Sequence, residues 1–235
     1  MMSNQSTAAA LAPELWTRIA YFCDDDTVRT LCSNSISRSI RESALLIRFR
    51  DLSFTVKYLF PAKVESQELD SEEYRAVLVS KVDSSRERFD QLSSSRFVSY
   101  VRYWRYEGPF SEFGSESDDD LYTNQEPTSD QLAASEYNDI MWPIFTGYLR
   151  KYNGLTALHL QNVDIDDKAV VSVNALGNLQ TLGLEKVKVS TAMNLGRRGS
   201  HIQHLLYVPD KVRSDFIVQL YISMQYYKFQ EVCLD

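Results

Sequence analysis

Residues 155–165 read LTALHLQNVDI and residues 179–189 read LQTLGLEKVKV, so two segments of the chain share one pattern 24 residues apart. Alternating apolar residues within each segment predict a short β-strand. Self-similarity at a fixed period of this length indicates a repeat architecture, in which stacked units bury a continuous core. The matching apolar residues are Leu155, Leu158, Leu160, Val163 and Ile165, and then Leu179, Leu182, Leu184, Val187 and Val189.

Weaker copies of the same pattern flank these two segments. One copy follows at an offset of 23 residues, a further copy follows after another 27 residues, and one precedes the pair. We therefore expect the strands to continue on both sides of the matched segments, with one strand from each unit. The apolar residues of these copies are Ile202, Leu205 and Tyr207, then Phe229, Val232 and Leu234, and upstream Val98, Val101 and Tyr103.

A period of about 20–29 residues with apolar positions one, four and six resembles the leucine-rich repeat. The resemblance implies one strand per unit in a parallel sheet, with a return by a helix or an irregular turn. Residues 166–176 and 210–224 both begin with Asp, a good helix cap, and are predicted to be such return helices. Val163 and Val187 stand where the best-known repeats carry Asn or Cys, so the expected solenoid is irregular. The predicted fold class is α/β, with the N-terminal helices followed by a short, irregular leucine-rich-repeat-like solenoid of parallel strands. The alternative is a generic α/β domain whose strands happen to be evenly spaced.

Two longer segments upstream of the matched pair are also predicted to be helices. Residues 68–92 place Leu78 and Val82 on an inner face, with acids early and arginines late, which suits the helix dipole. Residues 130–152 have a second helical pattern, which we expect Pro143 to interrupt because proline lacks a backbone donor and clashes with the preceding turn.

The N-terminal stretch, residues 11–54, is predicted to contain three short amphipathic helices. Pro13 and Glu14 suit a first helical turn, because proline fixes φ and a carboxylate favours the positive end of the dipole. The acidic run at residues 24–26 ends this helix and offers acceptors to the next, and a polar break at residues 33–35 precedes the third. The three apolar faces are Leu15, Ile19, Phe22 and Cys23; Val28, Leu31 and Cys32; and Ile36, Ile40, Ala44 and Ile47.

The order of residues in this stretch carries a second resemblance. It rests on Leu11, Pro13 to Leu15, Ile19, the Asp run, Leu31 and the Ser-Arg-Ser of residues 37–39. This order resembles an F-box of the kind common in fungal proteins. The resemblance implies that the opening Leu and Pro, with the apolar helix residues, insert into a groove on the Skp adaptor, which a cullin scaffold holds in a ubiquitin ligase. In this chain Ala12 displaces the proline by one residue from the family pattern. The implied adaptor-binding residues are Leu11, Pro13, Leu15, Ile19, Val28, Leu31 and Ile36.

The net charge of −7 is concentrated in residues 107–130, which contain eight Asp or Glu and no Lys or Arg. A segment of this composition buries too little apolar surface to offset the entropy of ordering, so we expect a disordered, solvated insertion. The alternative is a phosphorylation target at Ser111, Ser115 or Ser117. The predicted organisation is a disordered N-terminus at residues 1–10, an F-box at 11–54, and a repeat domain at 55–235 that contains this loop.

Composition excludes several classes of protein. The chain has 235 residues and is 44% hydrophobic, which is ample for a core. We expect no membrane partner, because the start lacks signal-peptide character and no stretch has the apolar length of a membrane span. The three cysteines indicate no disulfide framework and fit a reducing compartment, cytoplasmic or nuclear. Nucleic-acid binding is not expected, because no basic stripe accompanies the aromatic residues.

Catalytic and metal motifs are not found in the sequence. The six Cys and His residues are scattered, and they are too few for a two-zinc RING. His201 and His204 are predicted to lie on a turn and a strand, so we do not expect them to share a metal. The chain contains no GxSxG, P-loop or GxGxxG motif. We therefore expect no enzymatic activity of its own and no cofactor.

The predicted function is protein binding. If the strands are parallel, the residues between their apolar positions share one face and form a continuous patch. With the F-box resemblance, this implies a substrate receptor that joins an unidentified target protein to the Skp adaptor and its cullin. The alternative is a non-catalytic repeat scaffold whose N-terminal helices only cap the solenoid. The predicted target-binding residues are His159, Gln180, Thr181, His204 and Glu231.

Overall fold

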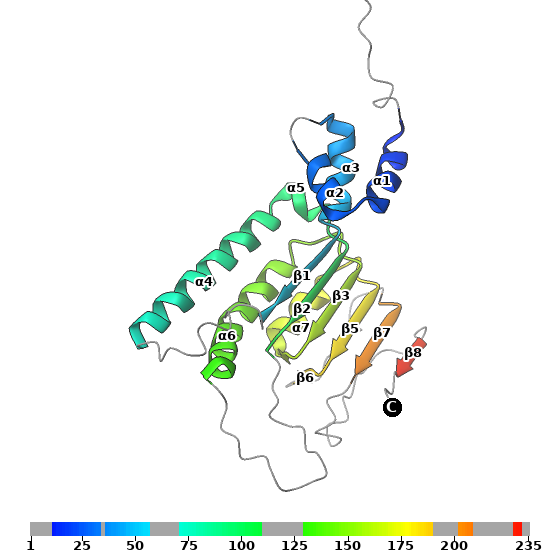
Figure 1. Cartoon of the computed structure of the whole chain (residues 1–235). Helices are drawn as coiled ribbons and strands as arrows, with labels where there is room; N and C mark the ends of the chain where they lie inside the picture. The colour runs from blue at the N-terminus through cyan, green and yellow to red at the C-terminus, as the bar shows by residue number, and fades with distance from the viewer. Residues whose placement is uncertain are drawn as a thin grey trace, which may run out of the picture.

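The computed structural model describes residues 11–33, 36–56, 71–109, 129–189, 202–208 and 228–231. Three predictions fall wholly or mostly outside these ranges: the disordered N-terminus, the acidic segment and the helix at residues 210–224. In the described part the chain has an α/β fold with a parallel sheet, as predicted (Figure 1). No helix among the described residues is both long and apolar enough to cross a membrane.

The first three helices lie where the sequence predicts them. They are α1 (Pro13–Phe22), α2 (Asp25–Leu31) and α3 (Arg38–Arg48). Pro13 occupies the first turn of α1, where its missing N–H has no helical partner to lose. Asp24 caps α2, because its carboxylate accepts a 2.7 Å hydrogen bond from the backbone amide of Thr27. The helical part of the N-terminal stretch ends at Arg48, and the residues that follow belong to the sheet.

Six parallel strands form the main sheet, and their order in the sheet follows their order in the chain (Figure 1). Each strand therefore adds beside the preceding one, as stacked repeats do. The strands are β1 (Asp51–Thr55), β2 (Tyr103–Glu107), β3 (Ala157–Gln161), β5 (Thr181–Glu185), β7 (His204–Val208) and β8 (Lys228–Glu231).

The sheet register confirms the central part of the sequence repeat. Leu158 of β3 pairs with Leu182 of β5, so the 24-residue period of the sequence is also the register of the strands. Leu182 in turn pairs with Leu205 of β7, which confirms the offset of 23.

The predicted register of the last copy is wrong by three residues. Phe229 of β8 pairs with Leu205, at an offset of 24, whereas the predicted spacing of 27 placed Val232 there. Positions one and four of the repeat are three residues apart, so apolar residues that recur every three residues fit the repeat in two alternative frames. Only the backbone pairing of the strands distinguishes these frames. Val232 and Leu234 lie outside the described residues.

The predicted register of the upstream copy has the same error. Trp104 of β2 pairs with Leu158. Val101 is therefore the residue equivalent to Leu155, whereas the predicted frame aligned Val98 with Leu155. Val98, Val101 and Trp104 are again three residues apart, which hid the true frame. Val101 and Trp104 are both fully buried.

The turns after the strands repeat as closely as the strands do. Asn162 and Lys186, which are 24 residues apart, both adopt positive φ, at 53° and 49°. Directly after these turns, β4 (Asp164–Ile165) and β6 (Lys188–Val189) form a second, two-stranded parallel sheet.

Gly108 occupies the equivalent position after β2. Its amide donates a 2.8 Å hydrogen bond to the carbonyl of Gln161. A Cβ atom at this position would lie 2.1 Å from the carbonyl oxygen of Asn162. The close approach of the two turns therefore requires glycine.

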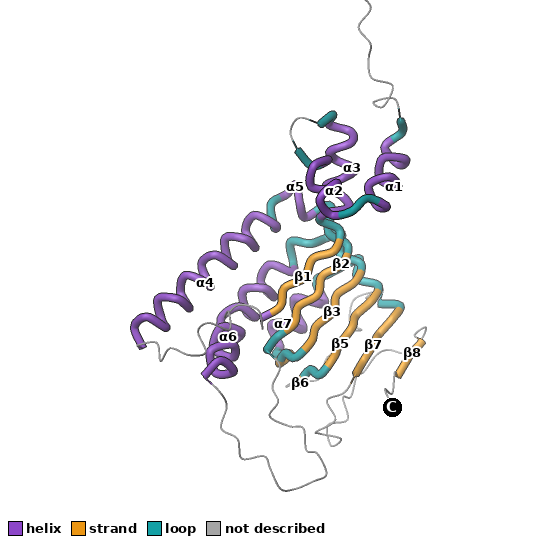
Figure 2. The backbone as a smooth tube through the Cα atoms, in the orientation of Figure 1, coloured by secondary structure: helices purple, strands orange, loops and turns teal. Residues whose placement is uncertain are grey.

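The helices that connect the strands gather on one side of the sheet (Figure 2). Helix α4 (Ser71–Leu92) and the short α5 (Ser95–Val98) join β1 to β2, α6 (Ser129–Leu149) joins β2 to β3, and α7 (Asp167–Asn174) joins β3 to β5. The helices predicted at residues 68–92 and 166–176 are confirmed. The prediction that Pro143 interrupts its helix is wrong, because α6 continues through it. Trp142, Phe145 and Leu149 are buried on this helix, and their packing outweighs the lost backbone hydrogen bond.

Aromatic side chains fill the core between the sheet and the helices. Trp104 of β2 packs against Tyr152 with ring centroids 4.5 Å apart, and Tyr106 packs against Phe145 of α6 at 4.6 Å. Phe89 of α4 lies 5.9 Å from Trp104. Since α4, α6 and β2 share this cluster, it fixes the helices on the sheet.

The N-terminal helices join the sheet at the end where its strands begin (Figure 1). The ring of Phe49, which ends α3, lies 4.5 Å from that of Phe97 in α5. Glu42 of α3 accepts a hydrogen bond from Tyr100 and lies 3.5 Å from Arg96. Glu42 of α3 and Phe49 directly after it thus connect the helical module, residues 13–48, to α5 and the turn that precedes β2.

Candidate functional site

Helix α1 turns an apolar face to solvent, which we call the α1 outer face: Leu11, Leu15, Ile19 and Phe22. Leu15 is 46% exposed, Ile19 is 41% exposed and Phe22 is 84% exposed. Ala20 is the only described residue of α1 that is buried, at 2%. Singly scattered apolar residues are common on protein surfaces, whereas a contiguous apolar stripe marks an interaction site.

The packing of the helical module explains this orientation. Ala20 is small and allows α1 to approach α3, where Ala44 and Leu45 are buried. The hydroxyl of Ser43 in α3 donates a 3.2 Å hydrogen bond to the carbonyl of Pro13. The module therefore buries Ala20 of α1, keeps Trp16 half-buried, and leaves Leu15, Ile19 and Phe22 exposed.

The structure places the seven predicted adaptor-binding residues in three environments. Leu11, Pro13, Leu15 and Ile19 are exposed on or beside α1. Leu31 and Ile36 are half-buried. Val28 is 4% exposed and belongs to the interior of the module, so its predicted contact with an adaptor is corrected to a packing role.

Phe22 is the most exposed large apolar residue of α1, and the predicted adaptor set omits it. Its spacing of three from Ile19 and seven from Leu15 was the signal, because these steps keep residues on one face of a helix.

The second candidate surface is the face of the sheet opposite the helices, which we call the open face. Side chains on β2 alternate, with Trp104 and Tyr106 buried and the residues between them half-exposed. The register brings these half-exposed residues into rows across neighbouring strands. One row is Ser53, Arg105, His159, Gly183 and Leu206, and the next is Thr55, Glu107, Gln161 and Glu185.

A hydrogen-bonded network runs along the open face from β2 to β5. Arg105 donates to the side-chain oxygen of Gln161 at 2.5 Å, and the amide nitrogen of Gln161 donates to Glu185 at 2.9 Å. The guanidinium of Arg105 also lies 3.6 Å from Glu107. Because each member holds the next, the network fixes the positions of these side chains on the open face.

His159 lies over Gly183 and contacts Glu185. Its Nε2 atom is 3.4 Å from the Glu185 carboxylate, and a Cβ on Gly183 would lie 2.9 Å from the imidazole. Burial lowers the pKa of His159 from its ordinary value, and this desolvation outweighs the opposing attraction of Glu185. At neutral pH the ring is therefore uncharged and serves as a polar contact.

The structure brings together three of the five predicted target-binding residues. Thr181 and His204 are register partners, and His159 lies in the neighbouring row. Gln180 precedes β5 and is exposed. Glu231 was expected beside His204, but it pairs with Tyr207, so its predicted place is wrong by three residues.

The prediction missed the members of the network that lie on β2, Arg105 and Glu107. They alternate with Trp104 and Tyr106, so the signal was present in the sequence. The incorrect upstream register concealed this signal. A shift of three residues assigns the side chains of β2 to the opposite faces of the sheet.

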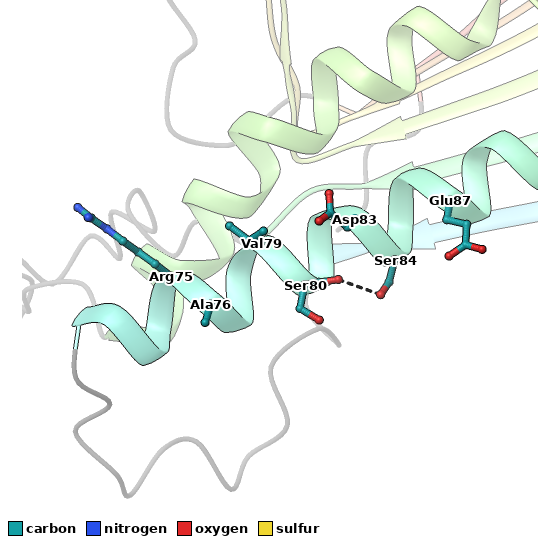
Figure 3. Close-up of a pocket in the computed structure, with 7 residues that line it drawn as sticks. All are labelled: Arg75, Ala76, Val79, Ser80, Asp83, Ser84 and Glu87. Atoms are coloured by element: carbon teal, nitrogen blue, oxygen red, sulfur yellow. Dashed lines mark hydrogen bonds between the residues drawn. The ribbon is translucent and has the colours of Figure 1, made fainter.

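A shallow hollow of about 660 Å³ lies along the outer side of α4 (Figure 3). Its lining residues, which include Arg75, Val79, Asp83 and Glu87, all come from this one helix. The Ser84 hydroxyl donates to the Ser80 carbonyl at 2.8 Å, which satisfies it within the helix. Because no second element of the described chain lines it, the hollow is a surface groove and not a built site.

The described residues contain no group of three or more His, Cys, Asp or Glu side chains placed to hold a metal. Burial raises the pKa of the Cys32 thiol, and the nearby Arg48 offsets this only in part, so the thiol is not an activated nucleophile.

Comparisons of the chain with protein-family models, with curated proteins and with solved structures return no match.

Proposed function

We propose that this protein is a non-catalytic receptor that docks on a Skp-type adaptor through the α1 outer face. In this proposal residues 13–48 are the F-box-like module, and the parallel strands form an irregular leucine-rich-repeat-like solenoid whose open face holds a target protein. The adaptor joins the chain to a cullin, and the assembled ligase transfers ubiquitin. The receptor would contribute proximity alone, by holding the target near the charged ubiquitin carrier.

One observation carries the proposal: Leu15, Ile19 and Phe22 are exposed together on a helix whose module is otherwise packed. Burying side chains of this size in a groove contributes about 1.5–3 kcal/mol each, before the cost of association. Leu11 and Pro13, the first residues of the F-box resemblance, are exposed at the start of the same helix.

The test is co-purification of the full chain with a Skp-type adaptor. We expect the wild-type chain to form a one-to-one complex and the double variant Leu15→Asp, Ile19→Asp to lose it, because two carboxylates would be buried unpaired. Val171→Asp is the matched control, since Val171 is an exposed apolar residue on α7, 54% accessible. A folded double variant that still binds the adaptor, or a wild-type chain that never does, refutes the proposal.

A second candidate function, a repeat scaffold capped by the N-terminal helices, is favoured by the contact of Phe49 with Phe97. In that case the module covers the end of the sheet instead of binding an adaptor. Deleting residues 1–50 separates the two functions. Loss of a cap exposes apolar surface and causes aggregation, whereas loss of a docking module leaves a soluble remainder.

A further inference from the structure

A tight turn shortly before β3 carries Asn153 and Gly154 at its tip. The amide of Leu155 donates a 3.0 Å hydrogen bond to the carbonyl of Tyr152, so these four residues form a β-turn with Asn153 and Gly154 in its centre. Tyr152 and Leu155 are both fully buried, whereas Asn153 is exposed. The core therefore holds the two ends of the turn and presents its tip to solvent.

Two groups at this tip have no hydrogen-bond partner in the described part of the chain: the side-chain amide of Asn153 and the backbone N–H of Gly154. The carbonyl of Asn153 is occupied, because it accepts a 2.6 Å hydrogen bond from the side-chain nitrogen of Asn178. This bond holds the main chain of the turn and leaves the side chain of Asn153 free to rotate. No described hydrogen bond therefore has to break before the two groups can meet.

These two groups can react with each other. The backbone nitrogen of Gly154, after losing its proton to solvent, attacks Cγ of Asn153 and closes a five-membered succinimide ring. The bond from Cγ to Nδ2 breaks, and ammonia leaves with a proton taken from water. Water then opens the ring at either carbonyl, which gives aspartate or isoaspartate. Glycine favours the attack because it has no Cβ to crowd the backbone nitrogen.

The guanidinium of Arg102 lies over Gly154. A Cβ atom on Gly154 would lie 2.5 Å from Nη1 of Arg102. This nitrogen donates to the carbonyls of Ser99 and Val101, at 2.8 and 2.9 Å, which holds the guanidinium in place. A fixed positive charge favours both the deprotonated amide and the oxyanion that forms during the attack. The fold thus adds electrostatic assistance to the local sequence.

Other asparagines do not combine these features. Asn153 is the only asparagine in the sequence that is followed by glycine. Asn138 lies within α6, and its side-chain oxygen accepts a hydrogen bond from Tyr106. Asn178 uses its side-chain nitrogen on the turn itself and precedes Leu179, whose side chain crowds the next backbone nitrogen.

We propose that Asn153 is a site of spontaneous deamidation through a succinimide, assisted by the guanidinium of Arg102. The turn before β3 thereby gains a negative charge as the protein ages. The isoaspartate product also adds one main-chain carbon between Tyr152 and Leu155, which the core holds in place, so it destabilises the turn. The site is separate from the α1 outer face and the open face, and the inference does not depend on adaptor docking.

The test is incubation of the full chain in mildly alkaline buffer, followed by peptide mass spectrometry with fragmentation that separates aspartate from isoaspartate. We expect both products at Asn153, and neither at Asn138 nor Asn178 over the same time. The rate should fall in mildly acidic buffer, because the attack requires the deprotonated amide.

Two arginine variants test the assistance. Arg102→Gln should slow the reaction about fivefold or more, because it removes the positive charge beside Gly154. Arg105→Gln, the same change three residues further along β2, should not slow it. Circular dichroism shows that each variant is folded before its rate is compared.

Thermal melting tests the consequence for stability. The aged chain should melt at a lower temperature than the fresh chain, because isoaspartate lengthens the main chain of the turn. Asn153→Asp should melt close to the wild type, because it adds the charge without the extra main-chain carbon.

Four results overturn the proposal. They are an unmodified Asn153, aspartate without isoaspartate, an equal rate in folded Arg102→Gln and wild type, and an aged chain that contains isoaspartate but melts like the fresh one. The second result would mean direct hydrolysis of the side chain without the ring.

Discussion

The α1 outer face and the open face of the sheet are both accessible to solvent, but they are built in opposite ways. The first presents Leu15, Ile19 and Phe22 from a single helix and has no polar network. The second presents Arg105 and Glu185 within a network that spans several strands. A surface of the first kind supplies affinity by burying apolar area. One of the second kind supplies selectivity, because an ill-matched partner leaves polar groups unpaired.

The largest expected effect is the difference in stability loss between truncating a buried residue of the sheet and truncating a residue of the α1 outer face. Leu182→Ala should reduce the free energy of unfolding by about 2–5 kcal/mol, because Leu182 is fully buried in β5. Leu15→Ala should reduce it by less, about 1 kcal/mol or under, because Leu15 is 46% exposed and has only part of its surface to lose from packing. Urea denaturation measures both. A large loss in Leu15→Ala would show that the α1 outer face packs within the protein, and the comparison would fail.

A second test disturbs the turn that follows Glu107 of the open face. Gly108→Ala should destabilise the protein by about 1–3 kcal/mol, because its Cβ would meet the Asn162 carbonyl at 2.1 Å. Gly147→Ala is the matched control. Nothing lies within 4 Å of a Cβ there, and alanine in the interior of α6 should stabilise by about 0.5–1 kcal/mol. Thermal melting distinguishes the two signs, and a neutral Gly108→Ala would contradict the close turn packing.

The smallest expected effect is a pH dependence that belongs to the open face. Because burial lowers the pKa of His159 in the folded state, the unfolded chain binds the proton more readily. The wild type should therefore lose stability as the pH falls below the ordinary histidine value of about 6.5, and His159→Gln should lose less over the same interval. Equal slopes in urea titrations at pH 7.5 and 5.5 would show that His159 is not held neutral in the fold.

The sequence predicted the centre of the sheet because two units match at five apolar positions, and the matched register of Leu158 with Leu182 follows directly. It failed at both ends, where residues such as Val98 and Val101 fit the same spacing in two frames. Only the strand pairing distinguishes these frames. Because the predicted frame of β2 was wrong, the prediction also missed the hydrogen-bonded network of the open face.

The helices show the same division between local and tertiary causes. The cap at Asp24 and the proline at the start of α1 are local, and both were predictable. The continuity of α6 through Pro143 depends on buried neighbours that the local pattern does not reveal. The apolar face of α1 was predicted from its spacing, whereas its outward direction was implied only by the F-box resemblance, because amphipathicity does not say whether a face meets the chain itself or a partner.

The most direct test of the central claim is hydrogen exchange of the full chain, measured by mass spectrometry with and without a saturating Skp-type adaptor. The account predicts slower exchange in α1, Pro13–Phe22, on adding the adaptor, with no change in β3, Ala157–Gln161. Unchanged exchange in α1, or protection confined to the sheet, would contradict docking through the α1 outer face.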